Sequence, residues 1–145
     1  MAFPDFPAEI RAPLGTVAGV SGFQVHIGNT EINTPGDVAD VLVAMNPAAL
    51  KANKNWIKKG GTIIINSDSF AKKDLDKAGY ENNPLEDGSF SGFNIVEAPI
   101  ANLTQETLKD SGLDGKSIRR AKNMFALGMV YWMYNRPMER TKKFL

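Results

Sequence analysis

Two asparagines stand where apolar runs of the sequence end. Asn46 ends one run and precedes Pro47, whereas Asn66 ends another and is followed by Ser67 and Asp68. An Asn in front of a helix can cap it, because its side-chain oxygen accepts a hydrogen bond from a backbone N–H group that the helix leaves free. The same N–H groups can hold an anion such as a phosphate or a carboxylate. The residues alone leave both interpretations open, a helix cap or turn and an anion site.

Other candidate chemistry is dispersed along the chain. The only histidine, His26, lies on the polar side of an alternating segment without a Ser or Cys nucleophile motif, so we interpret it as structural or solvent-facing. The chain has no cysteine and its carboxylates show no metal-ligand spacing, so we expect no metal site. No G-x-G-x-x-G motif precedes a helix, so dinucleotide binding is not predicted. The carboxylates considered are Asp37, Asp40, Asp68, Asp74, Glu81, Glu86, Asp87 and Glu97.

Two further clusters have structural explanations. Four lysines follow one expected helix and its exit, which is typical of a solvated helix face. Three aromatic residues near the C-terminus favour a core or a subunit interface over a platform for stacking. The lysines are Lys51, Lys54, Lys58 and Lys59, and the aromatic residues are Tyr131, Trp132 and Tyr134.

A strand–helix–strand unit must position the two asparagines. Residues 40–44 and 62–65 are runs rich in Val, Leu and Ile without polar alternation, which favours parallel strands buried on both faces. Pro47 opens the helix between them, and Gly60-Gly61 predicts the turn into the second strand. Ligands of such sheets lie outside the carboxyl ends of the strands. We therefore predict an α/β fold, three-layer α/β/α, with a mixed, largely parallel sheet of four or five strands.

Further elements are predicted on both sides of this unit. Alternation of Phe23, Val25 and Ile27 indicates a half-buried strand, and residues 93–98 indicate another. Ser69 is expected to cap a helix over 70–77 that ends at Gly79, before a polar loop over 80–92.

Helices are expected near the C-terminus. One begins at Thr104 and stops at Gly112, and Ser117 caps a longer one that extends to about Asn135. The second half of the longer helix is apolar on all sides, so we expect it to be buried all round. Gly128 within it indicates the close approach of another backbone.

Length and charge limit the classes of protein. The chain of 145 residues, with a net charge of +1, suits one soluble domain and shows no electrostatic signature of nucleic-acid binding. Its proline-rich start has no apolar core of a signal peptide, and no apolar run is long enough to span a membrane. A cytoplasmic location is the default expectation.

The order of several segments resembles a known family. ADVLVAMNPAAL, KKGGTIIINSD, IVEAPI and AKNMFALGMVYWMYNRP follow one another as in the gamma domain of 2-oxoacid:acceptor (pyruvate or 2-oxoglutarate ferredoxin) oxidoreductases. The likeness covers nearly all of residues 3–145 and is strongest to the alpha-subunit form. It implies that residues 1–145 form a single domain, truncated at the N-terminus, which lacks the family's first strand, glycine-rich turn and first helix.

The resemblance implies an accessory role. The whole enzyme would decarboxylate a 2-oxoacid oxidatively on thiamine diphosphate, pass electrons through iron–sulfur clusters and release acyl-CoA. The gamma domain would bind no cofactor alone. It would contact the thiamine-binding alpha or beta subunits or domains and help to close the active site and the coenzyme A entry. The isolated chain is expected to be inactive, a homodimer is an open alternative, and nucleic-acid and membrane partners are not expected.

The resemblance also suggests site residues. Arg11 corresponds to the arginine of the family's Arg-Gly-Gly segment and would pair with a phosphate or a carboxylate. Asn123 belongs to an N-M-x-x-L-G helix motif, for which we favour a structural role. Two other functions stay open, a stand-alone α/β binding module for a nucleotide-like anion and a structural remnant without ligand. The expected ligand-facing or interface residues are Arg11, Gly15, Ser21, Gln24, Asn46, Pro47 and Asn66, with no catalytic residue and no metal ligand.

Overall fold

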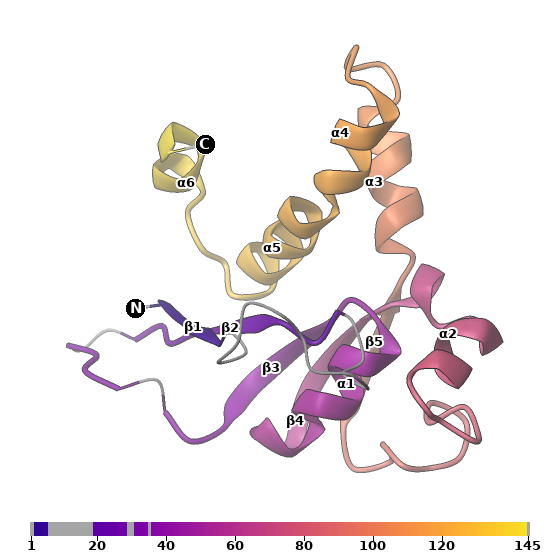
Figure 1. Cartoon of the computed structure of the whole chain (residues 1–145). Coiled ribbons are helices and arrows are strands. Elements are labelled where there is room, and N and C mark those ends of the chain that lie inside the picture. The colour runs from indigo at the N-terminus through magenta and orange to yellow at the C-terminus, as the bar shows by residue number, and fades with distance from the viewer. Residues whose placement is uncertain (1, 6–18, 29–30, 35, 145) are drawn as a thin grey trace. The chain divides into compact units, whose positions relative to one another are not determined.

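The chain divides into two compact units, Met1–Ala98 and Pro99–Leu145. A computed structural model describes residues 2–5, 19–28, 31–34 and 36–144 (Figure 1). The assignment of residues 1–145 to a single domain stays a prediction.

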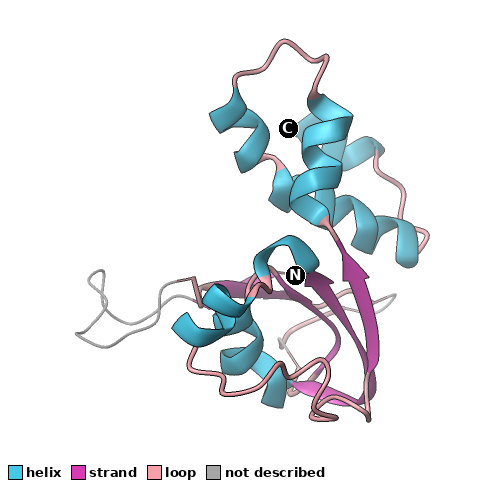
Figure 2. Ribbon diagram, turned by 90° about the vertical axis from the view of Figure 1, so that its right-hand side faces the viewer, coloured by secondary structure: helices cyan, strands magenta, loops and turns pink. Residues whose placement is uncertain are grey.

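The first unit is built on a parallel sheet. Its strands are β3 (Ala39–Ala44), β4 (Ile57–Asn66) and β5 (Asn94–Ala98), in the order β3-β4-β5 (Figure 2). The register places Val43 beside Ile64 and Ile64 beside Val96. The predicted α/β class and the parallel strands are therefore confirmed. The described residues contribute three strands to this sheet rather than the four or five expected, because the strand predicted around Phe23 pairs elsewhere.

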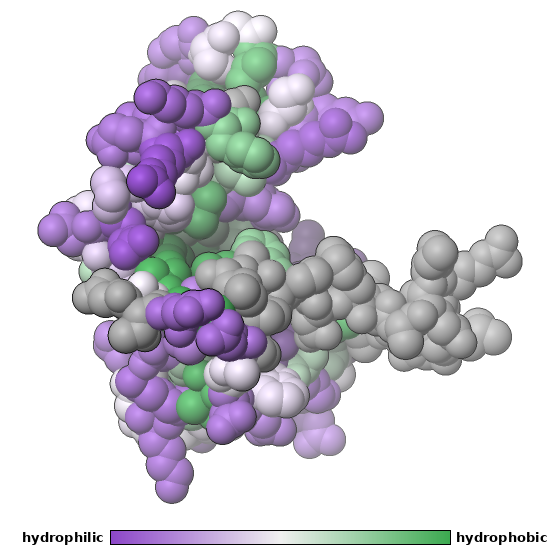
Figure 3. All heavy atoms as spheres, turned by 90° about the vertical axis from the view of Figure 1, so that its left-hand side faces the viewer, coloured by the Kyte–Doolittle hydropathy of each residue, from purple (hydrophilic) through white to green (hydrophobic). Residues whose placement is uncertain are grey.

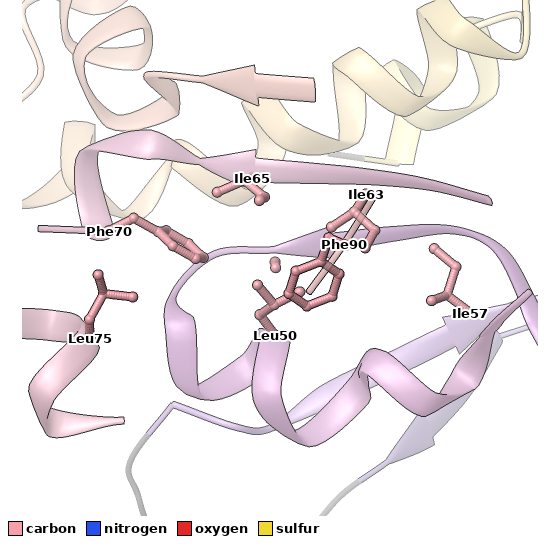
Figure 4. Packing of buried hydrophobic residues seen from close by; sticks show 8 residues of the cluster. Leu50, Ile57, Ile63, Ile65, Phe70, Leu75 and Phe90 are labelled. Atoms are coloured by element: carbon pink, nitrogen blue, oxygen red, sulfur yellow. The ribbon is translucent and has the colours of Figure 1, made fainter. Parts of the chain in front are cut away.

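Two helices cover one face of this sheet. They are α1 (Pro47–Asn53), as predicted, and α2 (Lys72–Lys77), with the short 3₁₀ turns η1 (Lys54–Trp56) and η2 (Ser67–Ser69) after α1 and β4. Leu50 of α1 and Leu75 of α2 pack with strand residues Ile63 and Ile65, which are fully buried (Figure 4). Apolar burial of this kind stabilises a fold by about 25 cal/mol per Å². The other buried members of the cluster are Ala44, Ile57, Phe70 and Phe90.

The glycine pair before the apolar part of β4 lies inside the strand, so the predicted turn there is wrong. Gly60 has φ +75° and donates its N–H to the carbonyl of Gly92 at 3.0 Å. A Cβ at Gly61 would lie 2.7 Å from Ile57 Cγ1, 2.9 Å from the Lys58 carbonyl oxygen and 3.1 Å from the Asp40 carbonyl oxygen. The pairing of β3 with β4 is irregular at this point. The glycines therefore allow two backbones to approach, a tertiary demand that local turn chemistry does not reveal.

The helix after β4 begins later than predicted. Ser69 does not cap it; the N-cap is Ala71, without a side-chain hydrogen bond, and Ser69 lies in η2. The C-terminal end near Gly79, at φ +71°, is as expected. Residues 80–92 contain no helix or strand, which confirms the predicted loop.

A separate two-stranded ribbon pairs β1 (Ala2–Asp5) with β2 (Gly22–Val25) in antiparallel orientation. The alternation that predicted β2 is present, but its apolar side is exposed. Phe23 is 71% exposed, Val25 and Ile27 are also exposed, and Gln24 is the half-buried residue. The strand is therefore confirmed, but the prediction that its apolar side is buried is wrong.

The second unit is helical. It contains α3 (Ile100–Leu108), α4 (Gly115–Arg120), α5 (Lys122–Met133) and α6 (Glu139–Phe144). The first of these begins four residues before Thr104, directly after Pro99. Among the described residues, no helix is both long and apolar enough to cross a membrane.

The single helix predicted from Ser117 is two helices with a break at Ala121. The cap of α4 is Asp114, whose carboxylate accepts from the Lys116 N–H at 3.1 Å and from the Ser117 hydroxyl. The break has no glycine or proline to announce it. Ser117 therefore supports the cap instead of being the cap.

Burial of α5 differs most from expectation. Within the helix only Ala126 is classed as buried, whereas Met124 is half exposed and Trp132 is 85% exposed. Among the described residues, no atom lies within 4 Å of a Cβ added at Gly128, so no described backbone approaches it. Neither the all-round burial nor the close approach of a backbone is found in the described part of the chain.

Candidate functional site at the carboxyl edge of the sheet

Asn46 stands between β3 and α1 and both ends of its amide are engaged. Its backbone is extended (φ −162°, ψ 165°), and its Oδ1 accepts from the N–H of Ala49 at 2.8 Å. Its Nδ2 donates to the carbonyl of Gly19 at 3.0 Å. Pro47 occupies the first helical turn and is buried, and a proline has no N–H to offer. Asn46 is therefore the helix cap, and through its hydrogen bond to Gly19 it also holds the segment before β2.

Gly19 is required by this contact. Its φ is +87°, which favours glycine, and a Cβ there would lie 2.8 Å from Asn46 Nδ2. Sequence reasoning did not select this residue. A glycine facing an asparagine 27 positions later leaves no local pattern to read.

Asn66 is fully buried at the end of β4. Its Nδ2 donates to Ser69 Oγ at 2.9 Å and, over a longer distance of 3.4 Å, to the carbonyl of Met45. A buried amide is costly unless it is hydrogen-bonded, so these contacts explain why it is tolerated inside. Asn66 therefore joins the exit of β4 to the exit of β3.

The remaining predicted site residues precede β3 in the sequence. Gln24 Nε2 donates to the carbonyl of Gly36 over 3.4 Å, and Ser21 is exposed. Arg11 and Gly15 lie outside the described residues. Of the seven residues, the structure brings Asn46, Pro47 and Asn66 together at the carboxyl edge of the sheet.

His26 is exposed, and its Nδ1 lies 2.9 Å from the carbonyl oxygen of Thr34. A carbonyl only accepts, so Nδ1 carries the proton in this contact. This geometry agrees with the structural or solvent-facing interpretation of the histidine. Among the described residues, no group of three or more His, Asp or Glu side chains is arranged to hold a metal ion.

One lysine has a role that the sequence did not indicate. Lys51 Nζ donates to the carbonyls of Ala78 at 3.0 Å and Gly79 at 2.7 Å, where α2 ends, and it lies 5.1 Å from the centre of the Tyr80 ring. Its interpretation as part of a solvated face is therefore incomplete. A cation at the C-terminus of a helix is favourable, and so is a cation over an aromatic face.

Burial affects the ionisation of Tyr80. Its hydroxyl oxygen is buried, and within the described part of the chain it has no hydrogen-bond partner. Burial raises the pKa of Tyr80, and the nearby negative charge of Asp87 raises it further. Hydrogen bonds from Ser89 lower the pKa of the exposed Asp87. Tyr80 therefore stays neutral at physiological pH and acts as a packing residue.

The comparison with known proteins gives the chain its family. The family model described as "Pyruvate ferredoxin/flavodoxin oxidoreductase" matches residues 1–145. The chain belongs to this family. It is similar to the 2-oxoglutarate oxidoreductase subunit KorA of Mycobacterium tuberculosis (strain ATCC 25618 / H37Rv), with 50% identity over 142 residues. That match covers 98% of this chain and 22% of the relative.

Membership of the pyruvate ferredoxin/flavodoxin oxidoreductase family confirms the resemblance inferred from the ordered segments. It does not assign ligand contacts to individual residues. Asn123, from the helix motif, lies near the start of α5 and is exposed. The choice of ligand-facing residues therefore stays a prediction. The hydrogen bonds that Asn46 and Asn66 make within the chain narrow this choice.

Proposed function

We propose that this chain is an accessory part of a 2-oxoacid:acceptor oxidoreductase that acts through subunit contacts and through closure of the active site and its coenzyme A entry. Family membership and the 50% identity to a 2-oxoglutarate oxidoreductase subunit support the assignment of the chain to a 2-oxoacid oxidoreductase. The chain spans 22% of the length of that subunit. Thiamine diphosphate, iron–sulfur clusters and coenzyme A are accordingly proposed for the whole enzyme and not for this chain alone.

The observation that supports an accessory role is the hydrogen bonding of Asn46 and the burial of Asn66. Asn46 uses its amide oxygen on α1 and its amide nitrogen on Gly19, and Asn66 is fully buried. Direct contact with coenzyme A is disfavoured, because those hydrogen bonds fix the Asn46 side chain and burial closes Asn66 off from solvent. Both fit a positioning role, because they fix the chain where β3 and β4 end.

The proposed closure follows from this positioning. By holding Gly19, Asn46 sets the place of the segment that leads through the exposed Ser21 to Gln24. In our proposal this segment, with Arg11 and Gly15 before it, faces the phosphates of coenzyme A, and Arg11 supplies the positive charge. When bound, coenzyme A would supply the thiol that accepts the acyl group. The chain's own residues would exclude water and orient the cofactor.

Calorimetry with coenzyme A tests this proposal. We expect weak binding that is lost on Arg11→Ala and kept on Arg119→Ala, a matched arginine on α4. Binding of nucleotides without binding of coenzyme A would contradict the proposal and favour a stand-alone anion-binding module. We also expect no turnover of any 2-oxoacid by the isolated chain, and reproducible turnover would overturn the accessory role.

A further inference from the structure

The C-terminal part of the chain carries a charge that the net value of +1 conceals. Residues 115–145 contain eight basic residues and one acidic residue, Glu139, a net charge of +7. Residues 1–114 contain nine basic and fifteen acidic residues, a net charge of −6. Such an asymmetry indicates a surface adapted to a partner of the opposite charge. The basic residues are Lys116, Arg119, Arg120, Lys122, Arg136, Arg140, Lys142 and Lys143.

The centre of this segment is apolar. Residues 123–135 contain no charged residue, and the basic residues lie before and after them. Met124, Gly128 and Trp132 follow one another at intervals of four, so they form a stripe along one side of α5. We call these three residues the α5 stripe.

The α5 stripe is open within the described part of the C-terminal unit. Met124 is 49% exposed and Trp132 is 85% exposed. No atom of the residues that the structure describes lies within 4 Å of a Cβ built at Gly128, so another molecule can approach the helix backbone there. Figure 3 shows hydrophilic side chains in purple around apolar ones in green over this unit. A helix that is apolar all round is normally buried, so a stripe in this state calls for a partner.

The basic residues after α5 are held next to it. The hydroxyl of Tyr131 lies 2.7 Å from that of Thr141, and this hydrogen bond ties α6 to α5. Arg140, Lys142 and Lys143 are on the helix that is tied in this way. At the other end, α4 carries Arg119 and Arg120 in its last turn. The α5 stripe therefore has positive charge at both of its ends.

We propose that the α5 stripe is a docking face for an apolar protein surface with an acidic rim, contributed by a thiamine-binding subunit of the same oxidoreductase. This rests on the proposed function. An apolar centre with exposed Trp and flanking Arg is the composition of interfaces that bind protein. A second copy docked through the same face would bring +7 against +7, which disfavours a homodimer through α5. Nucleic acid is disfavoured because the centre offers no cation to the phosphates.

Trp132 itself reports on the docking. The chain has two tryptophans, so Trp56→Phe leaves Trp132 as the only one. We would titrate this variant with the purified thiamine-binding subunit and record the emission of Trp132. We expect a blue shift, because docking moves the indole out of water. Association should also weaken as the NaCl concentration is raised from about 0.1 M to about 0.5 M.

Matched substitutions assign the effect to the stripe. Trp132→Gln should raise the Kd for the subunit at least about tenfold, as expected for a central interface residue. Trp56→Gln, at the other tryptophan, which is 59% exposed in η1, should change the Kd less than about twofold. Both side chains are exposed, so circular dichroism and urea unfolding should show that both variants stay folded.

Five outcomes would overturn the docking face. The first is wild-type affinity of Trp132→Gln, which contradicts the face while the proposed function stands. The second is no association of the wild-type chain, which contradicts both. The third is a blue shift with vesicles of phosphatidylcholine and phosphatidylglycerol but not with the subunit, which would assign the face to a membrane. The fourth is protection of Trp132 from acrylamide in the free monomer, and the fifth is a dimer, by light scattering, that Trp132→Gln dissociates.

Discussion

Replacement of Asn46 by alanine removes a helix cap and the contact with Gly19 in one step. The substitution removes the acceptor for the N–H of Ala49 at 2.8 Å and the donor to the carbonyl of Gly19 at 3.0 Å. Loss of an asparagine N-cap costs about 1 kcal/mol. Loss of a neutral hydrogen bond costs about 0.5–1 kcal/mol at a partly exposed site. We therefore expect Asn46→Ala to lower the free energy of unfolding by about 1.5–2 kcal/mol.

A serine at the same position divides this loss into its parts. Serine caps a helix about as well as asparagine, but its shorter side chain does not reach Gly19. We expect Asn46→Ser to lose only the Gly19 contact, about 0.5–1 kcal/mol. Asn82→Ala, in the exposed loop before Pro84, is the control, and it should stay within about 0.5 kcal/mol of wild type. Urea unfolding followed by circular dichroism measures all four proteins.

Two results would refute this reasoning. Equal losses for Asn46→Ser and Asn46→Ala would show that the cap contributes nothing. A difference between wild type and Asn46→Ala that stays constant with added coenzyme A would show that Asn46 does not position the segment proposed to face coenzyme A, because a ligand stabilises the state that binds it. If Asn46 positions this segment through Gly19, the difference widens.

Three further predictions concern other positions. Gly61→Ala should lower the free energy of unfolding by about 1–3 kcal/mol, because its Cβ would lie 2.7 Å from Ile57 and 2.9 Å from a backbone oxygen; a neutral result in urea unfolding would contradict the close approach. Gly128→Ala should raise the same free energy by about 0.5–1 kcal/mol, because an added Cβ meets open space in a helix, and a loss would show a contact there in solution. The hydrogen bond from Ser117 lowers the pKa of Asp114, so its capping contribution is complete above the ordinary value of 3.8 and is lost as the pH falls through the lowered value. Helical ellipticity should show an acid transition that Asp114→Asn reduces, and an unchanged transition would refute the cap.

The sequence predicted those elements whose cause is local. The apolar runs at 40–44 and 62–65 and the Asn-Pro start of α1 specify strand, cap and helix from neighbouring residues. The β5 strand and the loop before it are predicted for the same reason. These signals also carry the α/β class, because buried strands separated by a helix favour parallel pairing.

Elements with tertiary causes were missed. Gly60-Gly61 has the composition of a turn, yet the approach of Asp40 and Ile57 sets its conformation. The capping contact of Asn46 was foreseen, but its second partner, Gly19, lies 27 residues away and depends on the fold. No residue type near Ala121 indicates the break between α4 and α5.

The same distinction separates the two candidate surfaces of this chain. A polar group at the end of a parallel strand indicates a ligand more strongly when it lacks a partner in the protein. Asn46 and Asn66 have such partners, so the carboxyl edge argues for positioning. An apolar side chain on a helix indicates a core only while the fold covers it, and Trp132 stays 85% exposed. A chain that hydrogen-bonds Asn46 and Asn66 within its fold and exposes Trp132 to solvent is suited to bind another protein. The decisive tests therefore measure association before catalysis.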